Sequence, residues 1–175
     1  MIIWIDGPYG VGKSTVAKAL TCALPTDSIY LDSDEYYVKG LKQNQYFSGG
    51  AFPQNNQRFL IDFKELVKEN ARIHSVCVVA MALTMDESIN DLFIPLSKGE
   101  NDIYHIVLYA SLETITTRIN TQRDRENKDY AKKQVLKSIS FIKKNFFDCY
   151  WINTENGNVS DIVNQVKAIG FCENP

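Results

Sequence analysis

Short apolar stretches of strand length alternate along the chain with longer segments in which apolar positions recur at helical spacing. The apolar stretches predict strands at residues 2–5, 28–31, 75–83, 103–110 and 149–152. The helical spacing predicts helices at about residues 13–24, 55–70, 112–119, 130–144 and 159–169. Because strands alternate with helices, we expect an α/β fold: a parallel sheet with helices on both faces, formed by residues 1–175 as a single domain.

Two segments interrupt this alternation. Residues 33–50 contain several aromatic side chains and end in a Gly-Gly pair, whereas residues 121–133 are mostly charged and have no apolar period. Long connections in compact domains are either solvated loops or functional flaps over a site. The pattern alone leaves both interpretations open.

Charge and composition narrow the class of partner. The chain has 19 basic and 21 acidic residues, a net charge of -2 and a pI near 5.7, so we expect no nucleic acid as a partner. Hydrophobic residues make up 45% of the chain, which suits a buried core and excludes a disordered protein. No apolar stretch approaches the ~20 residues that span a bilayer, and no signal peptide is apparent. We therefore expect a cytoplasmic protein without membrane insertion.

The cysteines and histidines do not indicate a metal site. No CxxC pair occurs, so we expect free thiols and no zinc site. His105 lies inside a predicted strand and is interpreted as a packed or hydrogen-bonded core residue. The four cysteines are widely separated: Cys22, Cys77, Cys149 and Cys172.

Residues 7–14, GPYGVGKS, match the phosphate-binding pattern GxxxxGK[ST] and lie between a predicted strand and a predicted helix. Glycines let the backbone amides turn inward around phosphate, and the helix N-terminus adds its positive dipole end. Lys13 is predicted to reach the β- and γ-phosphates, and the Ser14 hydroxyl to bind Mg²⁺. The predicted nucleotide-binding residues of this segment are Gly7, Tyr9, Gly10, Val11, Gly12, Lys13, Ser14 and Thr15.

Carboxylates help to define the class of phosphate-loop protein. No acid ends the stretch at 75–83, which weighs against a standard ATPase, and no base-reading tetrad of a GTPase is present. Instead Asp32 ends the second predicted strand and Asp34 follows it. Carboxyl ends of parallel strands face the ligand crevice, so either acid could bind Mg²⁺ or accept a proton from a hydroxyl. We expect Ser14 and Asp32 to serve the metal; the alternative for both acids is a solvated turn or a helix N-cap.

Basic residues follow the fourth predicted strand. Phosphoryl transfer needs positive charge on the transferring group, and arginine supplies it with a planar fork. We expect Arg118 and Arg123 to stabilise that group and Arg125 to bind the nucleotide. The alternative is ordinary surface ion pairing.

With these features the chain resembles the small P-loop kinases of the adenylate, shikimate and gluconate kinase group, and within it the bacterial tunicamycin-resistance ATP-binding proteins. The resemblance rests on residues 1–14, 113–123 and 130–134. It implies the three-layer P-loop nucleoside-triphosphate hydrolase fold with a five-stranded parallel sheet in the order 2-3-1-4-5. It also implies a lid at about 121–135, an acceptor region at about 33–70, ATP with Mg²⁺, and a small-molecule acceptor such as a nucleoside-like antibiotic.

Within the acceptor region, aromatic side chains could stack a ring of the acceptor and Arg58 could bind an acid or phosphate. The alternative is that the aromatics Tyr36, Tyr37 and Phe52 form a small core. The loop at 153–157 lies where related kinases contact adenine.

Two functions remain in view. The first is an ATP- and Mg²⁺-dependent phosphotransferase, a monomer or homodimer, that acts on a small molecule. The second is an ATP-binding protein without transfer chemistry, which sequesters a ligand or acts as a switch.

Overall fold

A five-stranded sheet forms the centre of the protein, and all neighbouring strands are parallel in the order β2-β3-β1-β4-β5. The computed structural model describes residues 1–46, 52–121, 128–146 and 148–171, without the side chains of residues 128, 130 and 131. The strand order and the helices around the sheet confirm the α/β P-loop fold. The strands are β1 (Ile2–Asp6), β2 (Ser28–Asp32), β3 (Val76–Ala80), β4 (Ile103–Tyr109) and β5 (Tyr150–Asn153).

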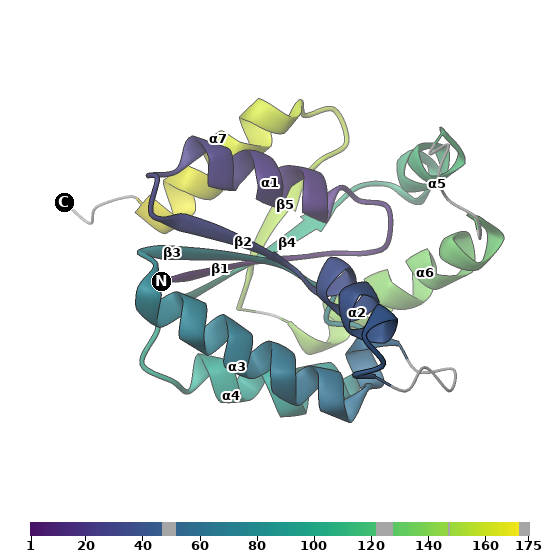
Figure 1. Ribbon diagram of the computed structural model, residues 1–175. Helices are drawn as coiled ribbons and strands as arrows, with labels where there is room; N and C mark the ends of the chain where they lie inside the picture. The colour runs from purple at the N-terminus through teal and green to yellow at the C-terminus, as the bar shows by residue number, and fades with distance from the viewer. Residues whose placement is uncertain (47–51, 122–127, 147, 172–175) are drawn as a thin grey trace.

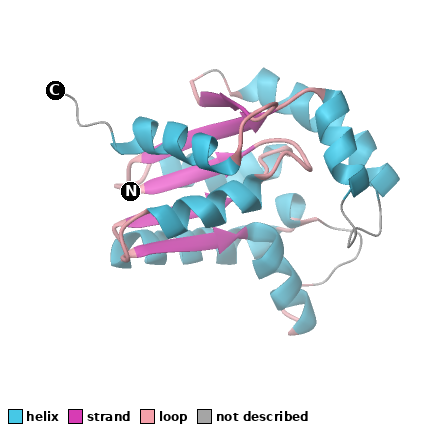
Figure 2. Ribbon diagram, turned by 90° about the horizontal axis from the view of Figure 1, so that it is seen from above, coloured by secondary structure: helices cyan, strands magenta, loops and turns pink. Residues whose placement is uncertain are grey.

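Helices cover both faces of the sheet. In Figure 1, α1 and α7 lie on one face and α3 and α4 on the other, while α2, α5 and α6 lie toward the carboxyl ends of the strands. Figure 2 shows the same layers from above, with the strands running in one direction. The helices are α1 (Lys13–Ala23), α2 (Ser33–Lys42), α3 (Gln57–Ile73), α4 (Ile94–Ser97), α5 (Leu112–Thr121), α6 (Lys128–Asn145) and α7 (Val159–Phe171). Two short turns complete the elements: a 3₁₀ turn, η1 (Pro53–Asn55), and a π-helical turn, η2 (Ser88–Phe93).

The two faces of the sheet have different cores. Side chains of a strand alternate between its faces. Ile3 of β1 therefore joins an aliphatic cluster with α1 and α7, whereas Trp4 joins a cluster rich in aromatic rings from α3. All five residues of β1 are buried, as the apolar runs predicted for interior strands.

The structure differs from the predicted element pattern at three places. Residues 33–42, expected as a connection, form α2, because Asp32 caps the helix by accepting from the backbone N–H groups of Asp34 and Glu35. The predicted strand at 75–83 ends at Ala80, since the N–H of Leu83 turns to the carboxylate of Asp6. Helical turns at 88–97 were not anticipated.

Aromatic packing explains why α2 stays close to α3. The ring of Tyr46 lies over Gly40, where an added Cβ would stand 2.0 Å from a ring carbon. Tyr46 also stacks on Tyr37, and both rings pack edge-on against Phe59. These rings form a small core within the acceptor region, residues 33–70, expected from the resemblance. Residues 47–51 lie outside the described residues.

The described cysteines are free thiols. Cys22 is exposed on α1, and burial raises the pKa of the Cys77 thiol in β3 to about 12 and that of Cys149 to about 11. Cys172 lies outside the described residues. Within the described ranges, no helix combines the length and apolar character needed to cross a membrane.

Candidate functional site

The phosphate loop adopts a conformation that only glycines take readily. Gly7, Gly10 and Gly12 have φ angles of 139°, 80° and 107°. α1 begins immediately after Gly12, which provides no side-chain cap for the first turn of the helix. The Lys13 ammonium folds back over the loop and donates to the carbonyls of Gly7 (3.0 Å) and Pro8 (3.2 Å). The loop therefore presents a helix N-terminus and an ammonium group together, an arrangement suited to phosphate.

Asp32 connects the phosphate loop to α2. Its Oδ2 accepts from the Ser14 hydroxyl at 2.7 Å and from the hydroxyl of Tyr30, while its Oδ1 accepts the two backbone N–H groups that begin α2. Burial alone would raise the pKa of Asp32, but these hydrogen bonds outweigh it and hold the pKa below its ordinary value. Asp32 is thus both the helix cap and the carboxylate beside Ser14.

The oxygen donors of Ser14 and Asp32 fit a magnesium ion that is shared with nucleotide phosphates. Mg²⁺ prefers oxygen ligands, keeps several waters and usually takes one or two protein carboxylates together with substrate phosphates. Among the described residues no group of three or more His, Cys, Asp or Glu side chains could hold a metal independently. The donor set therefore suits a metal that arrives with a nucleotide.

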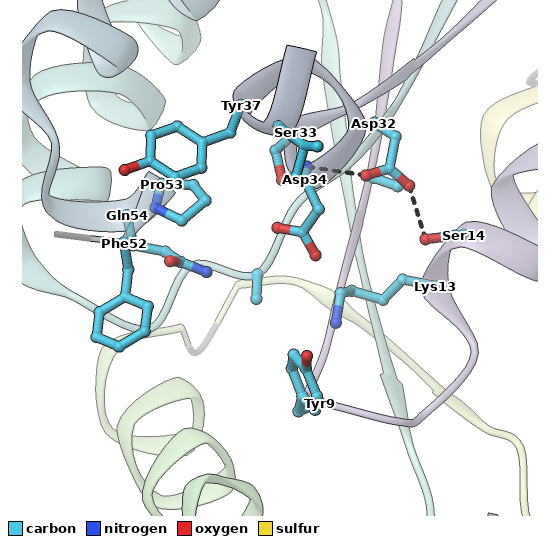
Figure 3. Close-up of a pocket in the computed structure, with 13 residues that line it drawn as sticks. Tyr9, Lys13, Ser14, Asp32, Ser33, Asp34, Tyr37, Phe52, Pro53 and Gln54 are labelled. Atoms are coloured by element: carbon cyan, nitrogen blue, oxygen red, sulfur yellow. Dashed lines mark hydrogen bonds between the residues drawn. The ribbon is translucent and has the colours of Figure 1, made fainter. Parts of the chain in front are cut away.

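A hollow of about 330 Å³ lies on one side of the phosphate loop, between it and α2; we call it the Asp34 hollow. In Figure 3, the carboxylate of Asp34 and the ammonium of Lys13 point into the same space, with Tyr9 and Phe52 at its border. Arg58 is not among its lining residues; its side chain is 71% exposed and its Nε pairs with Asp62 at 3.0 Å. The lining residues are Tyr9, Lys13, Ser14, Asp32, Ser33, Asp34, Tyr37, Val38, Phe52, Pro53, Gln54, Ala80 and Ala82.

A second hollow, of about 340 Å³, lies on the other side of the loop; we call it the Arg118 hollow. It is formed by the loop, the end of α5 and the connection after β5. Its lining residues are Gly10, Val11, Gly12, Thr15, Val16, Arg118, Thr121, Thr154, Gly157, Val159 and Ile162.

Arg118 ties the segments around this second hollow together. Its guanidinium donates to the carbonyl of Val11 (3.3 Å) and to the hydroxyl (2.9 Å) and carbonyl of Thr154. Glu155 adds a second tie, because its carboxylate accepts from the Ser111 N–H and hydroxyl and from the Thr114 hydroxyl at the start of α5. The structure therefore places Arg118 beside the connection after β5, away from the residues that line the Asp34 hollow.

The predicted site residues divide between these places. Lys13, Ser14, Asp32 and Asp34 come together at the Asp34 hollow, and the sequence had placed Tyr37 and Phe52 in the same region. The residues Gly10, Val11, Gly12, Thr15 and Arg118 line the Arg118 hollow. Tyr36 packs against Phe59 and Phe63 as part of the core. Arg123 and Arg125 lie outside the described residues.

Asp6 supports the start of the phosphate loop, and sequence reasoning missed it. It is fully buried and accepts from the N–H groups of Gly7 (2.6 Å) and Leu83 (3.0 Å), with the His105 ring nitrogen 3.0 Å from its Oδ2. The sequence carried a signal for this role, because Asp6 is an acid that ends an apolar strand directly before the glycine loop. The interpretation of His105 as a hydrogen-bonded core residue agrees with this contact.

Comparisons with known proteins point to the same fold. A family model described as "AAA domain" matches residues 2–141. The tunicamycin resistance protein from Deinococcus radiodurans is 22% identical, with a TM-score of 0.73 over 99% of this chain and 98% of that chain. Thymidylate kinase from Candida albicans is 16% identical, with a TM-score of 0.67 over 96% and 89%. Shikimate kinase from Bacteroides thetaiotaomicron is 14% identical, with a TM-score of 0.63 over 97% of both chains. No curated protein sequence matches the chain.

Proposed function

The chain belongs to the AAA domain family, and from this premise we propose that it is an ATP- and Mg²⁺-dependent phosphotransferase acting on a hydroxyl of a small molecule. One observation carries the proposal: two hollows of similar size flank a single phosphate loop. A transferase needs sites for two substrates on opposite sides of the phosphoryl group, because donor and acceptor must meet in line. A simple nucleotide hydrolase has no use for a second, aromatic-lined hollow.

In this proposal the nucleobase occupies the Arg118 hollow and the phosphates follow the loop amides from Gly7 to Thr15. The connection after β5 borders the space for the base with Thr154 and Gly157. Arg118 then orients the nucleotide from the base side, and we propose that Arg123 and Arg125 reach the transferring phosphoryl. We treat residues 33–70 as the acceptor region and residues 121–135 as a lid within a single domain.

The two carboxylates take different roles. Asp32 already accepts several hydrogen bonds and has a lowered pKa, so it is a poor proton acceptor and a good anionic partner for a metal. Asp34 is exposed and points into the hollow, where it can accept the proton of an acceptor hydroxyl. The hydroxyl oxygen forms a bond to the γ-phosphorus, the bond from that phosphorus to the bridging oxygen breaks, and ADP leaves.

The remaining positive charge comes from Lys13 and the metal. The Lys13 ammonium already lies at the loop, where it donates to the carbonyls of Gly7 and Pro8. In this proposal it donates to phosphate oxygens instead when nucleotide binds. A bound Mg²⁺, held by Ser14 and Asp32, would neutralise charge on the phosphates. These groups explain how a loop in a near-neutral protein can bind a polyanion.

The test is turnover of ATP with a panel of hydroxyl compounds that includes a nucleoside antibiotic, because one similar structure is a tunicamycin resistance protein. Lys13→Ala should lower turnover about 10²–10³-fold, the usual loss for one electrostatic group at a developing charge. Lys18→Ala is the matched control, since Lys18 lies on the same helix but pairs with Glu35 on the exposed surface. Unchanged turnover in Lys13→Ala would contradict the proposal.

The second candidate, ATP binding without transfer, is favoured by one observation: the residues after β3, from Met81 to Met85, include no carboxylate. The same panel separates the two functions. A phosphorylated product supports transfer, whereas tight ATP binding with no product from any compound supports sequestration or switching.

A further inference from the structure

We infer that the acceptor of the Asp34 hollow carries no anionic group and presents a flat apolar face, as an uncharged ring compound with a hydroxyl does. The inference rests on the proposed function, which assigns this hollow to the acceptor. It adds the chemical class of that acceptor. Three observations support it: the charge of the lining residues, the position of Arg58 and the shape of the hollow.

The charge of the lining disfavours an anion. Its described charged residues are the carboxylate of Asp34, the carboxylate of Asp32, which the proposed function assigns to Mg²⁺, and the ammonium of Lys13. Lys13 is engaged by the phosphate loop through two carbonyls, so its charge belongs to the nucleotide side of the hollow. A carboxylate or phosphate on the acceptor would enter beside Asp34, and apart from Lys13 the described lining contains no arginine or lysine to receive it. Like charges that approach in a partly dehydrated cavity repel each other.

Arg58, the one arginine in the sequence of the acceptor region, does not supply the missing positive charge at the hollow. Arg58 begins the first turn of α3, but its Nε donates to Asp62 on the same helix at 3.0 Å. It is absent from the lining, and to reach the hollow it would have to leave this partner. The sequence-based expectation that Arg58 binds an acid or phosphate therefore finds no support in its position.

The shape of the hollow favours a ring. Tyr9, Val38 and Phe52 are 39%, 47% and 40% exposed and together border the hollow, so three apolar side chains face one space. Tyr37 stands behind them, locked between Tyr46 and Phe59. Apolar walls with few convergent polar groups are typical of small-molecule sites, and aromatic walls stack on flat ligands.

Matched pairs of compounds test the charge preference directly. Thymidine and thymidylate share a ring and differ by a phosphate; methyl shikimate and shikimate share a ring and differ by a carboxylate charge. Binding of each is measured by NMR on the wild-type protein with a non-hydrolysable ATP analogue present, and chemical-shift changes at Phe52 and Val38 locate the site. We expect the uncharged member of at least one pair to bind about tenfold more tightly than its anionic partner. Tighter or equal binding of the anions, or binding by neither neutral compound, would overturn the inference.

A charge change sharpens the test. Val38→Arg places a cation at the border of the hollow and should raise affinity for thymidylate at least about fivefold relative to thymidine. Val38→Gln is the matched control, with similar polarity and no charge, and should not change the preference. If Val38→Arg leaves the ratio of the two affinities unchanged, charge in the hollow does not select the acceptor.

The outcome also separates this inference from the proposed function. If uncharged compounds bind in the hollow and none becomes phosphorylated, the transferase proposal fails, while the preference of the hollow for uncharged ring compounds stands. If a phosphorylated product forms only from anionic compounds, the transferase proposal stands and the acceptor class fails.

Discussion

The two hollows beside the phosphate loop are similar in volume, yet the chemical groups at their borders differ. Backbone carbonyls dominate the polar contacts of Arg118, which donates to Val11 and Thr154 across gaps of 107 and 36 residues in the chain. Exposed side chains such as Tyr9 and Phe52 make the border of the Asp34 hollow. Every substitution keeps a backbone carbonyl, whereas each substitution in an aromatic wall changes its shape. Substitutions near the Asp34 hollow therefore change its shape more readily than substitutions near the Arg118 hollow, which agrees with the proposed placement of the acceptor in the first and ATP in the second.

The largest effect is expected from distorting the phosphate loop, because both hollows share it. In Gly7→Ala the new Cβ would lie 2.4 Å from the carbonyl oxygen of Leu108, at a φ of 139° that a side chain rarely adopts. Because backbone cannot move aside easily, we expect a loss of about 3 kcal/mol in unfolding free energy and loss of ATP binding. Chemical denaturation and calorimetry of ATP binding measure both effects.

Gly12→Ala is the comparison for that variant. Gly12 also has a positive φ, but an added Cβ meets nothing within 4 Å. We expect a loss of about 1 kcal/mol from backbone strain alone. Equal losses in the two variants would mean that contact with β4 does not contribute.

The next largest effect separates the hollows. Arg118→Ala removes the hydrogen bonds to Val11 and Thr154, so ATP affinity should fall about 30-fold, while the affinity ratio between neutral and anionic acceptors should stay the same. Arg72→Ala, at an exposed arginine near the end of α3, is the control. A changed acceptor ratio with unchanged ATP affinity would reverse the assignment of the two hollows.

A smaller effect is expected on the acceptor side. Phe52→Ala removes an exposed wall of the Asp34 hollow, so the acceptor KM should rise about fivefold to tenfold while ATP affinity stays within about twofold. Because Phe52 is 40% exposed, we expect its replacement to leave the melting temperature nearly unchanged, which thermal melting checks. Ile61→Ala, at an exposed residue of α3 outside the lining, is the control. A KM that does not move would remove Phe52 from the acceptor site.

The smallest effect compares Asp32, which lines the Asp34 hollow, with Glu155, which lies in the connection after β5 beside the Arg118 hollow. The pKa of Asp32 lies below its ordinary value because hydrogen bonds from Tyr30 and Ser14 outweigh burial, and that of Glu155 is lowered chiefly by the Ser111 N–H. A lowered folded-state pKa gives stability that is complete above the unfolded value, about 4, and is lost as pH falls through the folded one. Melting temperatures should therefore drop below about pH 4.

Variants assign that drop to each acid. Asp32→Asn should flatten the acid side of the stability curve more than Glu155→Gln, because Asp32 is buried whereas Glu155 is more exposed and its bonds are better screened. Melting between pH 7 and pH 2.5 measures the slopes. A steeper slope in either variant would contradict the sign of the pKa change.

Features fixed by short-range pattern were predictable from sequence, and features fixed by distant contacts were not. The glycine loop, the start of α1 and the strand that precedes them follow from adjacent residues, so the P-loop fold could be predicted. β3 ends early because Leu83 meets Asp6, a contact between residues 77 positions apart. The position of Arg118 depends likewise on the connection after β5, which no local pattern specifies. The cap that begins α2 was visible locally, and only as one of two interpretations of Asp32.

One free thiol, Cys22 on α1, offers a position for attaching a dye near the phosphate loop. Cys77 and Cys149 have raised pKa values, so their thiolate forms are scarce at neutral pH, whereas Cys22 is exposed. Cys22 follows Lys13 by nine positions on α1, which corresponds to about 14 Å along the helix axis. In a Cys172→Ser variant, a maleimide dye should therefore attach to Cys22 in preference to Cys77 or Cys149, and its emission would report events at the loop through the helix that joins them.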